Sequence, residues 1–388
     1  MSDPDVIKSS FQKWKIWASI FLGISVAGFM LYRSLNETRF VKVGAGKGTH
    51  RWVDGNHNKV VDLSQSIDFK LDNVGDYKIE SLSDVLLSIH WTEKTLFWIF
   101  IALLCMVGRD FFYMWRIRLL TNDQLTWKKS FSVIMLWEFA SALSPGVVGG
   151  AAVAMFILNR EKIALGRSTA IVFITTMMDN LFYVMMIPLT FLFISSADLF
   201  PVSYSGSGAI QVVFWTGYSL IAAAAILLFL ALFVWPYFSK KLLGGLFSLP
   251  FLKRWKVKAV QTGEDIVVTS QEMKKETFLS WVQVYLVTCG SWISRYLVIN
   301  AILQAFLQLS FFDHALILGK QFVLWLFMLI SPTPGASGVA EYAFGELLIS
   351  FSGSTILLAG MAVIWRLISY FPYLFIGAWI LPRFLRKK

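Results

Sequence analysis

Nine ionisable side chains interrupt stretches of this sequence that are otherwise apolar. They are Arg109, Asp110, Glu138, Asp179, Arg295, Lys320, Glu341, Glu346 and Arg366. Charged groups are costly in hydrocarbon, so they are rare in membrane segments and usually mark a function. Asp179, Arg295 and Arg366 lie closest to the centres of their apolar segments. We expect these three to contact a ligand directly or to orient helices through internal ion pairs, and the sequence leaves both roles open.

Two further features divide apolar runs that would otherwise form single helices. Ser144-Pro-Gly-Val-Val-Gly-Gly150 interrupts the run Phe131–Leu158, and a second Pro-Gly-rich segment, Ile330–Glu341, interrupts Leu316–Leu348. Proline removes a backbone donor and clashes with the preceding turn of a helix. At membrane depth such irregular backbone survives only where protein or a water-filled cavity covers its polar groups. We therefore predict that the functional site lies at these two breaks.

A new half-helix is expected to begin after each break, near Gly149 and Gly338. Free amides and the positive end of the helix dipole make such a terminus suitable for a phosphate or a carboxylate. A lipid phosphate is the natural anion at this depth. Close helix packing through small residues would account for the same glycines. The candidate substrate-binding residues are Gly146, Gly149, Gly150, Asp179, Arg295, Pro334, Gly335, Gly338, Glu341 and Arg366.

The composition narrows the class of protein. The chain has 388 residues, of which 56% are hydrophobic, and a formal charge of +11. This hydrophobicity is typical of a polytopic membrane protein. The basic residues lie beside apolar segments, so we interpret them as topology signals and as contacts with anionic lipid headgroups, and we expect no nucleic acid as partner. The two cysteines and four histidines have no disulfide or metal spacing, and no nucleotide motif is present. We expect no cofactor, no metal site and no catalytic residues.

Six apolar runs reach the roughly 20 residues that a spanning helix needs. They are Trp14–Tyr32, Thr95–Trp115, Thr169–Ile194, Ala209–Trp235, Phe278–Phe306 and Thr355–Leu381. If both broken runs are hairpins that return to their own side, the basic segments around them and the basic C-terminus all lie in the cytoplasm, as the positive-inside rule prefers. Among these basic flanks are Arg116, Arg118, Lys128 and Lys129 before the first broken run.

The predicted fold class is therefore an all-α polytopic membrane protein, with about six spanning helices and two oppositely oriented re-entrant helical hairpins that form an inverted repeat. The charges support the repeat: Arg109 and Asp179 each lie 35 positions from Ser144, while Arg295 and Arg366 lie 36 and 35 positions from Ser331. Inverted repeats with broken helices that meet near the midplane are typical of secondary transporters.

Five parts follow from this topology. They are an N-terminal membrane helix (1–32), an extracytoplasmic loop or small domain (33–94), a first helix-hairpin-helix repeat (95–194), a connecting helix with a basic cytoplasmic segment (195–277), and a second repeat with a basic tail (278–388). The segment Trp52–Asn56 with the alternating residues Val60–Leu71 predicts a small β-hairpin. Leu252–Lys275 is basic and fits an amphipathic helix on the cytoplasmic lipid surface or a solvated connector.

At these breaks the chain resembles the flippase-like family built on the transmembrane region of lysylphosphatidylglycerol synthases. Pro334-Gly-Ala-Ser-Gly-Val-Ala-Glu341 is similar to the Pro-Gly-Gly-x-Gly-x-x-Glu pattern of that family, and Arg366-Leu-Ile-Ser-Tyr-Phe-Pro372 matches its last helix. The first break, followed by Asn159-Arg160 and Asp179, resembles the first-half pattern. The resemblance runs from about Thr95 to the C-terminus.

The resemblance implies an inner-membrane protein that moves lipids between leaflets or assists their modification. Many members have a Glu shortly after the first Pro-Gly, where this chain has Gly150, Ala151 and Ala152. This departure argues against an acid-dependent step at the first hairpin. The soluble aminoacyl-transfer domain does not follow before Lys388, so we expect this chain not to synthesise aminoacyl lipid by itself.

The function expected from the sequence is a lipid flippase or transporter for a phosphate-bearing lipid, either a phospholipid or a polyprenyl-linked lipid. The expected partners are anionic or lipid-linked membrane lipids and a separate lipid-modifying enzyme. The alternatives are a membrane-embedded transferase and an accessory subunit for the modification of lipid-linked substrates. The expected location is the inner (cytoplasmic) membrane, crossed several times, with both termini in the cytoplasm.

Overall fold

The computed structural model describes residues 40–55, 57, 61, 66–80, 91–143, 148–200, 207–248, 256–274, 276–331 and 333–386, with isolated positions at 21, 25 and 32. Within these ranges six helical segments are long and apolar enough to cross a membrane. They are Glu93–Leu120, Gly166–Phe193, Ile210–Val234, Phe278–Phe306, Phe311–Ile330 and Thr355–Arg386. The prediction of an all-α polytopic membrane protein is therefore confirmed.

The set of six differs from the predicted one at one position. The predicted helix Trp14–Tyr32 lies outside the described residues, apart from the isolated positions 21, 25 and 32. Its place is taken by Phe311–Ile330, which the sequence assigned to the first leg of the second hairpin. Twenty residues of helix reach about 30 Å, the thickness of the hydrocarbon core. Length alone therefore does not separate a spanning helix from a long hairpin leg, and the re-entrant hairpins stay a prediction.

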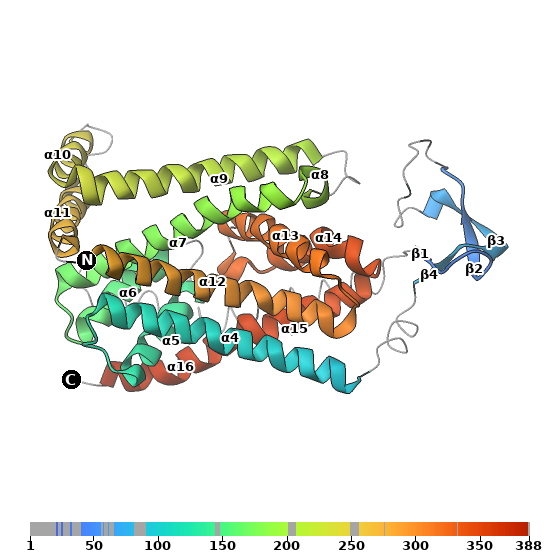
Figure 1. Ribbon diagram of the computed structural model, residues 1–388, viewed down its shortest axis with the longest axis horizontal. Helices are drawn as coiled ribbons and strands as arrows, with labels where there is room; N and C mark the ends of the chain where they lie inside the picture. Colours follow the sequence, from blue (N-terminus) through green and yellow to red (C-terminus); the bar gives the residue numbers. More distant parts are fainter. Residues whose placement is uncertain are drawn as a thin grey trace.

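Four long helices form the frame of the bundle and run along its long axis (Figure 1). They are α4 (Glu93–Leu120), α7 (Leu165–Phe193), α9 (Ser207–Phe229) and α12 (Phe278–Phe306). Helices α4 and α12 pack along each other, and Gly290 makes room for the ring of Phe112, whose atoms would lie 2.9–3.0 Å from a Cβ at that position. Small residues let helices approach closely in a membrane, where burial of apolar surface against lipid supplies no driving force.

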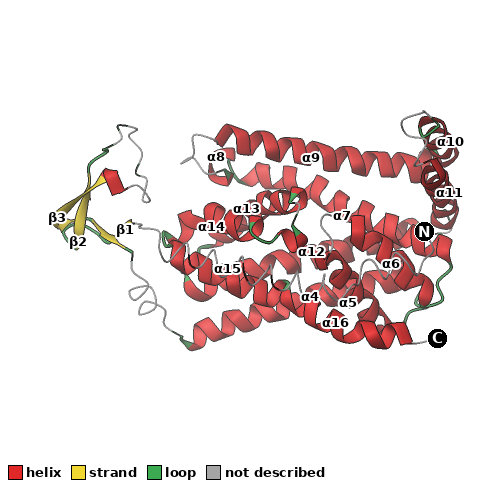
Figure 2. Cartoon of the chain, turned by 180° about the vertical axis from the view of Figure 1, so that it is seen from behind, coloured by secondary structure: helices red, strands yellow, loops and turns green. Residues whose placement is uncertain are grey.

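The broken runs form two pairs of shorter helices. Helices α5 (Trp127–Leu143) and α6 (Val148–Arg160) pack on each other, as do α13 (Phe311–Ile330) and α14 (Val339–Ser352). The first pair lies toward the end of the bundle that carries α10 and α11, and the second lies toward the β-sheet (Figures 1 and 2). A short 3-10 helix, η4 (Pro334–Ala336), joins α13 to α14 and contacts α5. The second interrupted region therefore contacts α5, the helix that precedes the first one.

The predicted helix Thr355–Leu381 is two helices, α15 (Thr355–Ser369) and α16 (Phe371–Arg386). Tyr370 separates them with dihedral angles of φ −123° and ψ −57°. The predicted spanning segment is confirmed, since Thr355–Arg386 is one of the six candidate spans. It divides at Tyr370 because Pro372 has no backbone N–H and its ring crowds the preceding turn. The bend turns Tyr370 and the start of α16 toward α5.

Smaller elements lie at the two ends of the bundle. A four-stranded sheet, in the order β1-β4-β2-β3, consists of β1 (Phe40–Lys42), β2 (Gly48–Trp52), β3 (Phe69–Gly75), which follows η1 (Ser66–Asp68), and β4 (Tyr77–Ile79). Strands β2 and β3 pair antiparallel, as predicted for a hairpin, although the second strand begins at Phe69. At the other end lie α10 (Pro236–Leu246) and α11 (Lys256–Met273). Two short elements flank α9: α8 (Ser196–Leu199) precedes it and η2 (Leu230–Val234) follows it. Helix α11 confirms the predicted helix in Leu252–Lys275.

The contact between α5 and α16 provides a test of this packing. A Cβ at Gly377 would lie 2.3 Å from Phe139 Cβ and 2.4 Å from its Cγ. We predict that Gly377→Ala lowers the free energy of unfolding by about 1–3 kcal/mol, because overpacking forces neighbouring atoms to shift. The measurement is thermal unfolding of the purified protein in detergent. The control is Gly360→Ala on α15, where a Cβ meets open space. Equal melting temperatures for the two variants would contradict the close packing of α16 on α5.

Candidate functional site

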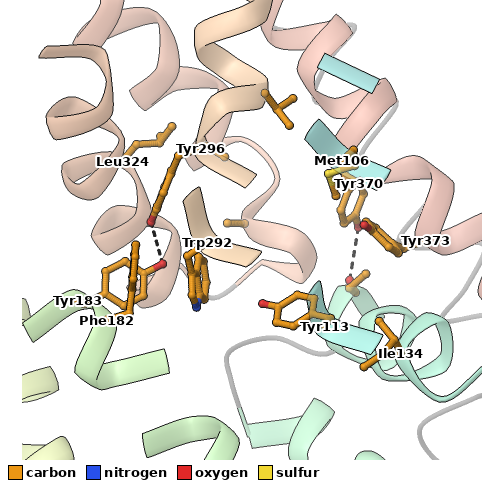
Figure 3. Packing of buried hydrophobic residues seen from close by; sticks show 14 of the residues in the cluster. Met106, Tyr113, Ile134, Phe182, Tyr183, Trp292, Tyr296, Leu324, Tyr370 and Tyr373 are labelled. Atoms are coloured by element: carbon orange, nitrogen blue, oxygen red, sulfur yellow. Dashed lines mark hydrogen bonds between the residues drawn. The ribbon is translucent and has the colours of Figure 1, made fainter. Parts of the chain in front are cut away.

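A cavity of about 340 Å³ lies between the two halves of the helical bundle. Its lining comes from α4, α5, α6 and α7 in the first half and from α12, α13, η4, α15 and α16 in the second. Aromatic rings form much of the surface, and Figure 3 shows Tyr113, Tyr183, Trp292 and Tyr373 arranged around it. Four predicted site residues line the cavity: Asp179, Arg295, Gly335 and Arg366.

Arg366 is held by an acid from the second helix pair. Its Nε donates to Glu341 Oε1 at 2.7 Å, and both side chains are about 95% buried. The other oxygen of Glu341 accepts the backbone N–H of Gly338 at 2.7 Å. Glu341 therefore caps the N-terminus of α14 and orients Arg366 at the same time. Because this carboxylate already occupies the Gly338 amide, an anion in the cavity would meet the guanidinium rather than this amide.

Asp179 is paired in a similar way, but with an arginine from the first half. Its Oδ1 accepts from Arg116 Nη1 at 2.6 Å and from Trp292 Nε1 at 2.9 Å. The sequence placed Arg116 in a basic flank outside the apolar core of its helix, whereas α4 continues to Leu120 and the side chain is 5% exposed. The internal ion pair that the sequence left open for Asp179 is therefore present. A signal for Arg116 existed, since it lies seven positions after Arg109 on the same helical face.

Arg109 forms the third ion-paired cluster, and it is fully buried. Nη1 donates to Asp110 Oδ1 at 2.8 Å and to the hydroxyl oxygen of Tyr373 at 2.6 Å, while Nη2 lies 2.7 Å from Glu138 Oε2. The Tyr113 ring lies between the guanidiniums of Arg109 and Arg116, at 4.3 and 4.6 Å from their Cζ atoms. This cluster ties α4 to α5 and α16, and it brings Glu138 to the cavity wall.

Arg295 differs from the other three arginines. Its side chain is half-buried and lines the cavity, and none of the described residues accepts a hydrogen bond from it or pairs with it. Its Cζ atom lies over the Trp292 ring, 5.5 Å from the ring centroid. On Arg366, Nη2 is also buried without a hydrogen-bond partner. Unmatched guanidinium donors therefore remain on two arginines of the cavity wall.

The predicted glycines and proline shape the backbone around this site. Gly335 has φ +59° and carries no Cβ against Tyr370, whose ring atoms would lie 2.2–2.6 Å away. Gly338 has φ +92°, so both positions use conformations that favour glycine. Pro334 begins η4 and Gly149 lies in the first turn of α6. Gly150 leaves room for Ser141 of α5, and Gly146 lies outside the described residues.

The breaks are connected through Tyr370. Its ring packs over Gly335, and its hydroxyl donates to the Ala142 carbonyl oxygen at 3.4 Å, in the last turn of α5. A second aromatic group closes the opposite wall, where the hydroxyls of Tyr183 and Tyr296 are 2.8 Å apart and Tyr183 stacks on Trp325. In the part of the chain that the structure describes, no three His, Cys, Asp or Glu side chains come together in a way that could hold a metal ion.

The chain is similar in sequence to a known family of membrane proteins. The family model described as lysylphosphatidylglycerol synthase TM region matches residues 75–377. A UPF0104 membrane protein of Archaeoglobus fulgidus is 23% identical over 297 residues, which cover 72% of this chain and 85% of that protein. No solved structure matches the chain.

The ion pair of Glu341 and Arg366 predicts a large effect of one truncation. Glu341→Ala leaves a buried guanidinium without its acid, which costs about 3–5 kcal/mol of unfolding free energy. The double variant Glu341→Ala/Arg366→Met recovers most of this loss because no buried charge remains. Chemical unfolding in detergent measures both. Glu264→Ala is the control, since the pair of Glu264 with Lys240 is half exposed and contributes less than about 1 kcal/mol. Equal losses of unfolding free energy in Glu264→Ala and Glu341→Ala would contradict the buried ion pair.

Proposed function

The chain belongs to the family of the lysylphosphatidylglycerol synthase TM region, and we propose that it moves a phosphate-bearing lipid between the two leaflets of its membrane. The multi-pass helical bundle and the family fit a role with membrane lipids.

The unmatched donors of Arg295 and Arg366 support the phosphate most directly. A buried charged donor without an acceptor costs free energy that a ligand oxygen can recover. Guanidinium groups present several N–H donors in a plane and bind phosphate through paired hydrogen bonds. In a membrane the phosphate available at this depth belongs to a lipid. Asp179 and Glu341 act here by ordering Arg116 and Arg366, since both carboxylates are already paired.

The size of the cavity is consistent with a headgroup. About 340 Å³ lies at the lower end of the range of roughly 300–1,000 Å³ found for small-molecule sites. A phosphate with a small polar group fits this space, whereas two acyl chains do not. The headgroup would therefore pass through the protein while the chains remain in the bilayer. This division separates the polar part of the lipid, which is costly to move through hydrocarbon, from the apolar part, which is not.

The two helix pairs suggest how the cavity could open to either side. We propose that α5–α6 and α13–α14 are re-entrant hairpins that enter from opposite faces and form an inverted repeat. In transporters built this way, the site stays near the midplane while one repeat moves against the other. The contact of η4 with α5 and the hydroxyl of Tyr370 on Ala142 would separate in this motion. The proposed location is the inner membrane, with both termini in the cytoplasm.

Arg295→Ala tests the phosphate role without disturbing an ion pair. We expect about tenfold weaker binding of an anionic phospholipid and a matching loss of lipid movement, because one charge-assisted contact contributes about 1.5–3 kcal/mol. Native mass spectrometry and a leaflet-exchange assay in proteoliposomes measure the two effects. The control is Arg383→Ala, because Arg383 stacks on Trp379 in the last turn of α16, away from the cavity. Unchanged binding and movement in Arg295→Ala would refute the phosphate site, and an inactive wild type that co-purifies with an enzyme would favour an accessory subunit.

The hairpin topology has a separate test. In a background with Cys105 and Cys289 replaced by serine, Lys128→Cys and Ala164→Cys flank the first helix pair at exposed positions. We expect an impermeant thiol reagent to label both from the same side of the membrane, and Phe312→Cys from the other side. Labelling of Lys128→Cys and Ala164→Cys from opposite sides would show that this pair spans the membrane.

A further inference from the structure

A small chamber opens beside the main cavity, between α4, α5 and α7. It encloses about 60 Å³, and its polar and aromatic lining consists of Tyr113, Arg116, Trp137, Glu138, Thr175 and Asp179. All of these except Arg116 also line the main cavity, so the two spaces adjoin. Arg295 and Arg366, which carry the unmatched donors, line the main cavity and not the chamber.

The charges around the chamber do not balance. Arg109 pairs with both Asp110 and Glu138, and Arg116 pairs with Asp179. Two guanidiniums are thus shared among three carboxylates, of which Glu138 and Asp179 line the chamber, and one negative charge is unmatched. Arg295, which lines the main cavity, is a positive charge that no acid of the described residues pairs with. An uncompensated charge inside a membrane protein is costly, so the two excess charges together favour a ligand that carries a positive and a negative group.

Three residues that line the chamber carry side-chain oxygen atoms without a hydrogen-bond partner among the described residues. Glu138 pairs with Arg109 through Oε2, which leaves Oε1 without a hydrogen bond from the described residues. Asp179 accepts from Arg116 and Trp292 through Oδ1, which leaves Oδ2 without one. Thr175 is 95% buried, and its hydroxyl has no hydrogen-bond partner among the described side chains and backbone groups. Trp137 adds an aromatic ring to the lining. Carboxylates, a hydroxyl and an indole ring are the groups that bind an ammonium ion.

We propose that this chamber binds the ammonium group of the transported lipid, so that the substrate is an aminophospholipid with one ammonium and one phosphodiester in its headgroup. This inference rests on the proposed transport of a phosphate-bearing lipid and adds the chemical class of the headgroup. The chamber has a volume of about 60 Å³ and adjoins the main cavity, so an aminomethyl end can enter it. A primary ammonium brings three N–H donors to the carboxylate oxygens and the hydroxyl, whereas a trimethylammonium group brings none.

Binding of three short-chain lipids to the purified chain in detergent tests the chamber. We expect dioctanoylphosphatidylethanolamine to bind about tenfold more tightly than dioctanoylphosphatidylglycerol, which has hydroxyls in place of the ammonium, because a charge-assisted contact is lost. Dioctanoylphosphatidylcholine should bind as weakly as the glycerol lipid. Soluble ethanolamine phosphate should not compete at the same concentration, and equal competition by it would overturn the assignment to a lipid.

Two variants and a matched control locate the effect. Glu138→Gln should abolish the preference for the ethanolamine lipid, and Thr175→Val should reduce it about fivefold, since the ammonium loses one acceptor and a typical hydrogen bond contributes about 1 kcal/mol net. Thr175→Val preserves shape and removes no charge, so it remains informative if Glu138→Gln folds poorly. Thr176→Val is the control, because the Thr176 hydroxyl already donates to the Val172 carbonyl oxygen; it should keep the full preference.

The outcomes separate the chamber from transport itself. Equal binding of the ethanolamine and glycerol lipids by the wild type, or an equal loss of preference in Thr175→Val and Thr176→Val, would overturn the chamber. If the wild type binds both lipids equally and also moves both labelled lipids equally in proteoliposomes, the chamber is rejected and the transport proposal is retained. Selective binding without any movement would support the chamber and overturn transport.

Discussion

The cost of a bare charge in a low-dielectric interior is the constraint on which this structure depends. Arg109, Arg116 and Arg366 are all buried, and each reaches a carboxylate on another helix. These pairs join α4 to α5, α4 to α7 and α14 to α15. Removing one partner of such a pair leaves an uncompensated charge, which is far more costly than the pair itself is stabilising. The ion pairs therefore specify which helices are neighbours more than they add stability.

The same constraint explains how irregular backbone survives in the interior. At the second break Gly335 and Gly338 adopt positive φ angles, and Glu341 accepts the Gly338 amide that the broken helix leaves free. The carboxylate that caps the helix is also the acid that holds Arg366. Backbone geometry at the break and the position of a cationic side chain are thus coupled through one residue. A shift of α14 would move the guanidinium with it.

The arrangement of unmatched charge distinguishes the cavity from the rest of the interior. Most buried ionic groups are paired, whereas Arg295 faces the cavity without an acid and the cluster around Glu138 has one acid too many. In a protein that belongs to a lipid-related membrane family, these two excess charges are where a ligand gains most from binding. The proposed phosphate and ammonium contacts are the two halves of this one electrostatic pattern.

Much of the architecture follows from the sequence by itself. Apolar length predicts the long helices, and the Pro-Gly segments predict where two runs break, because a bilayer penalises exposed backbone groups wherever they occur. The family resemblance rests on the same breaks and on Arg366. Intramembrane Asp179, Arg295 and Glu341 also stand out from composition alone, and in the structure Asp179 and Arg295 line the same cavity while Glu341 is paired with Arg366.

Only the tertiary structure decided how the charges are paired. Arg116 belongs by sequence to a basic flank, yet the extension of α4 buries it against Asp179, which is 63 positions away in the chain. Glu138 is paired and Arg295 is left without an acid because of helix packing that no local pattern encodes. The bend at Tyr370, which links the second break to α5, likewise depends on contacts between distant segments. Local sequence determines where charge and irregular backbone occur, and long-range packing determines which of them remain available to a ligand.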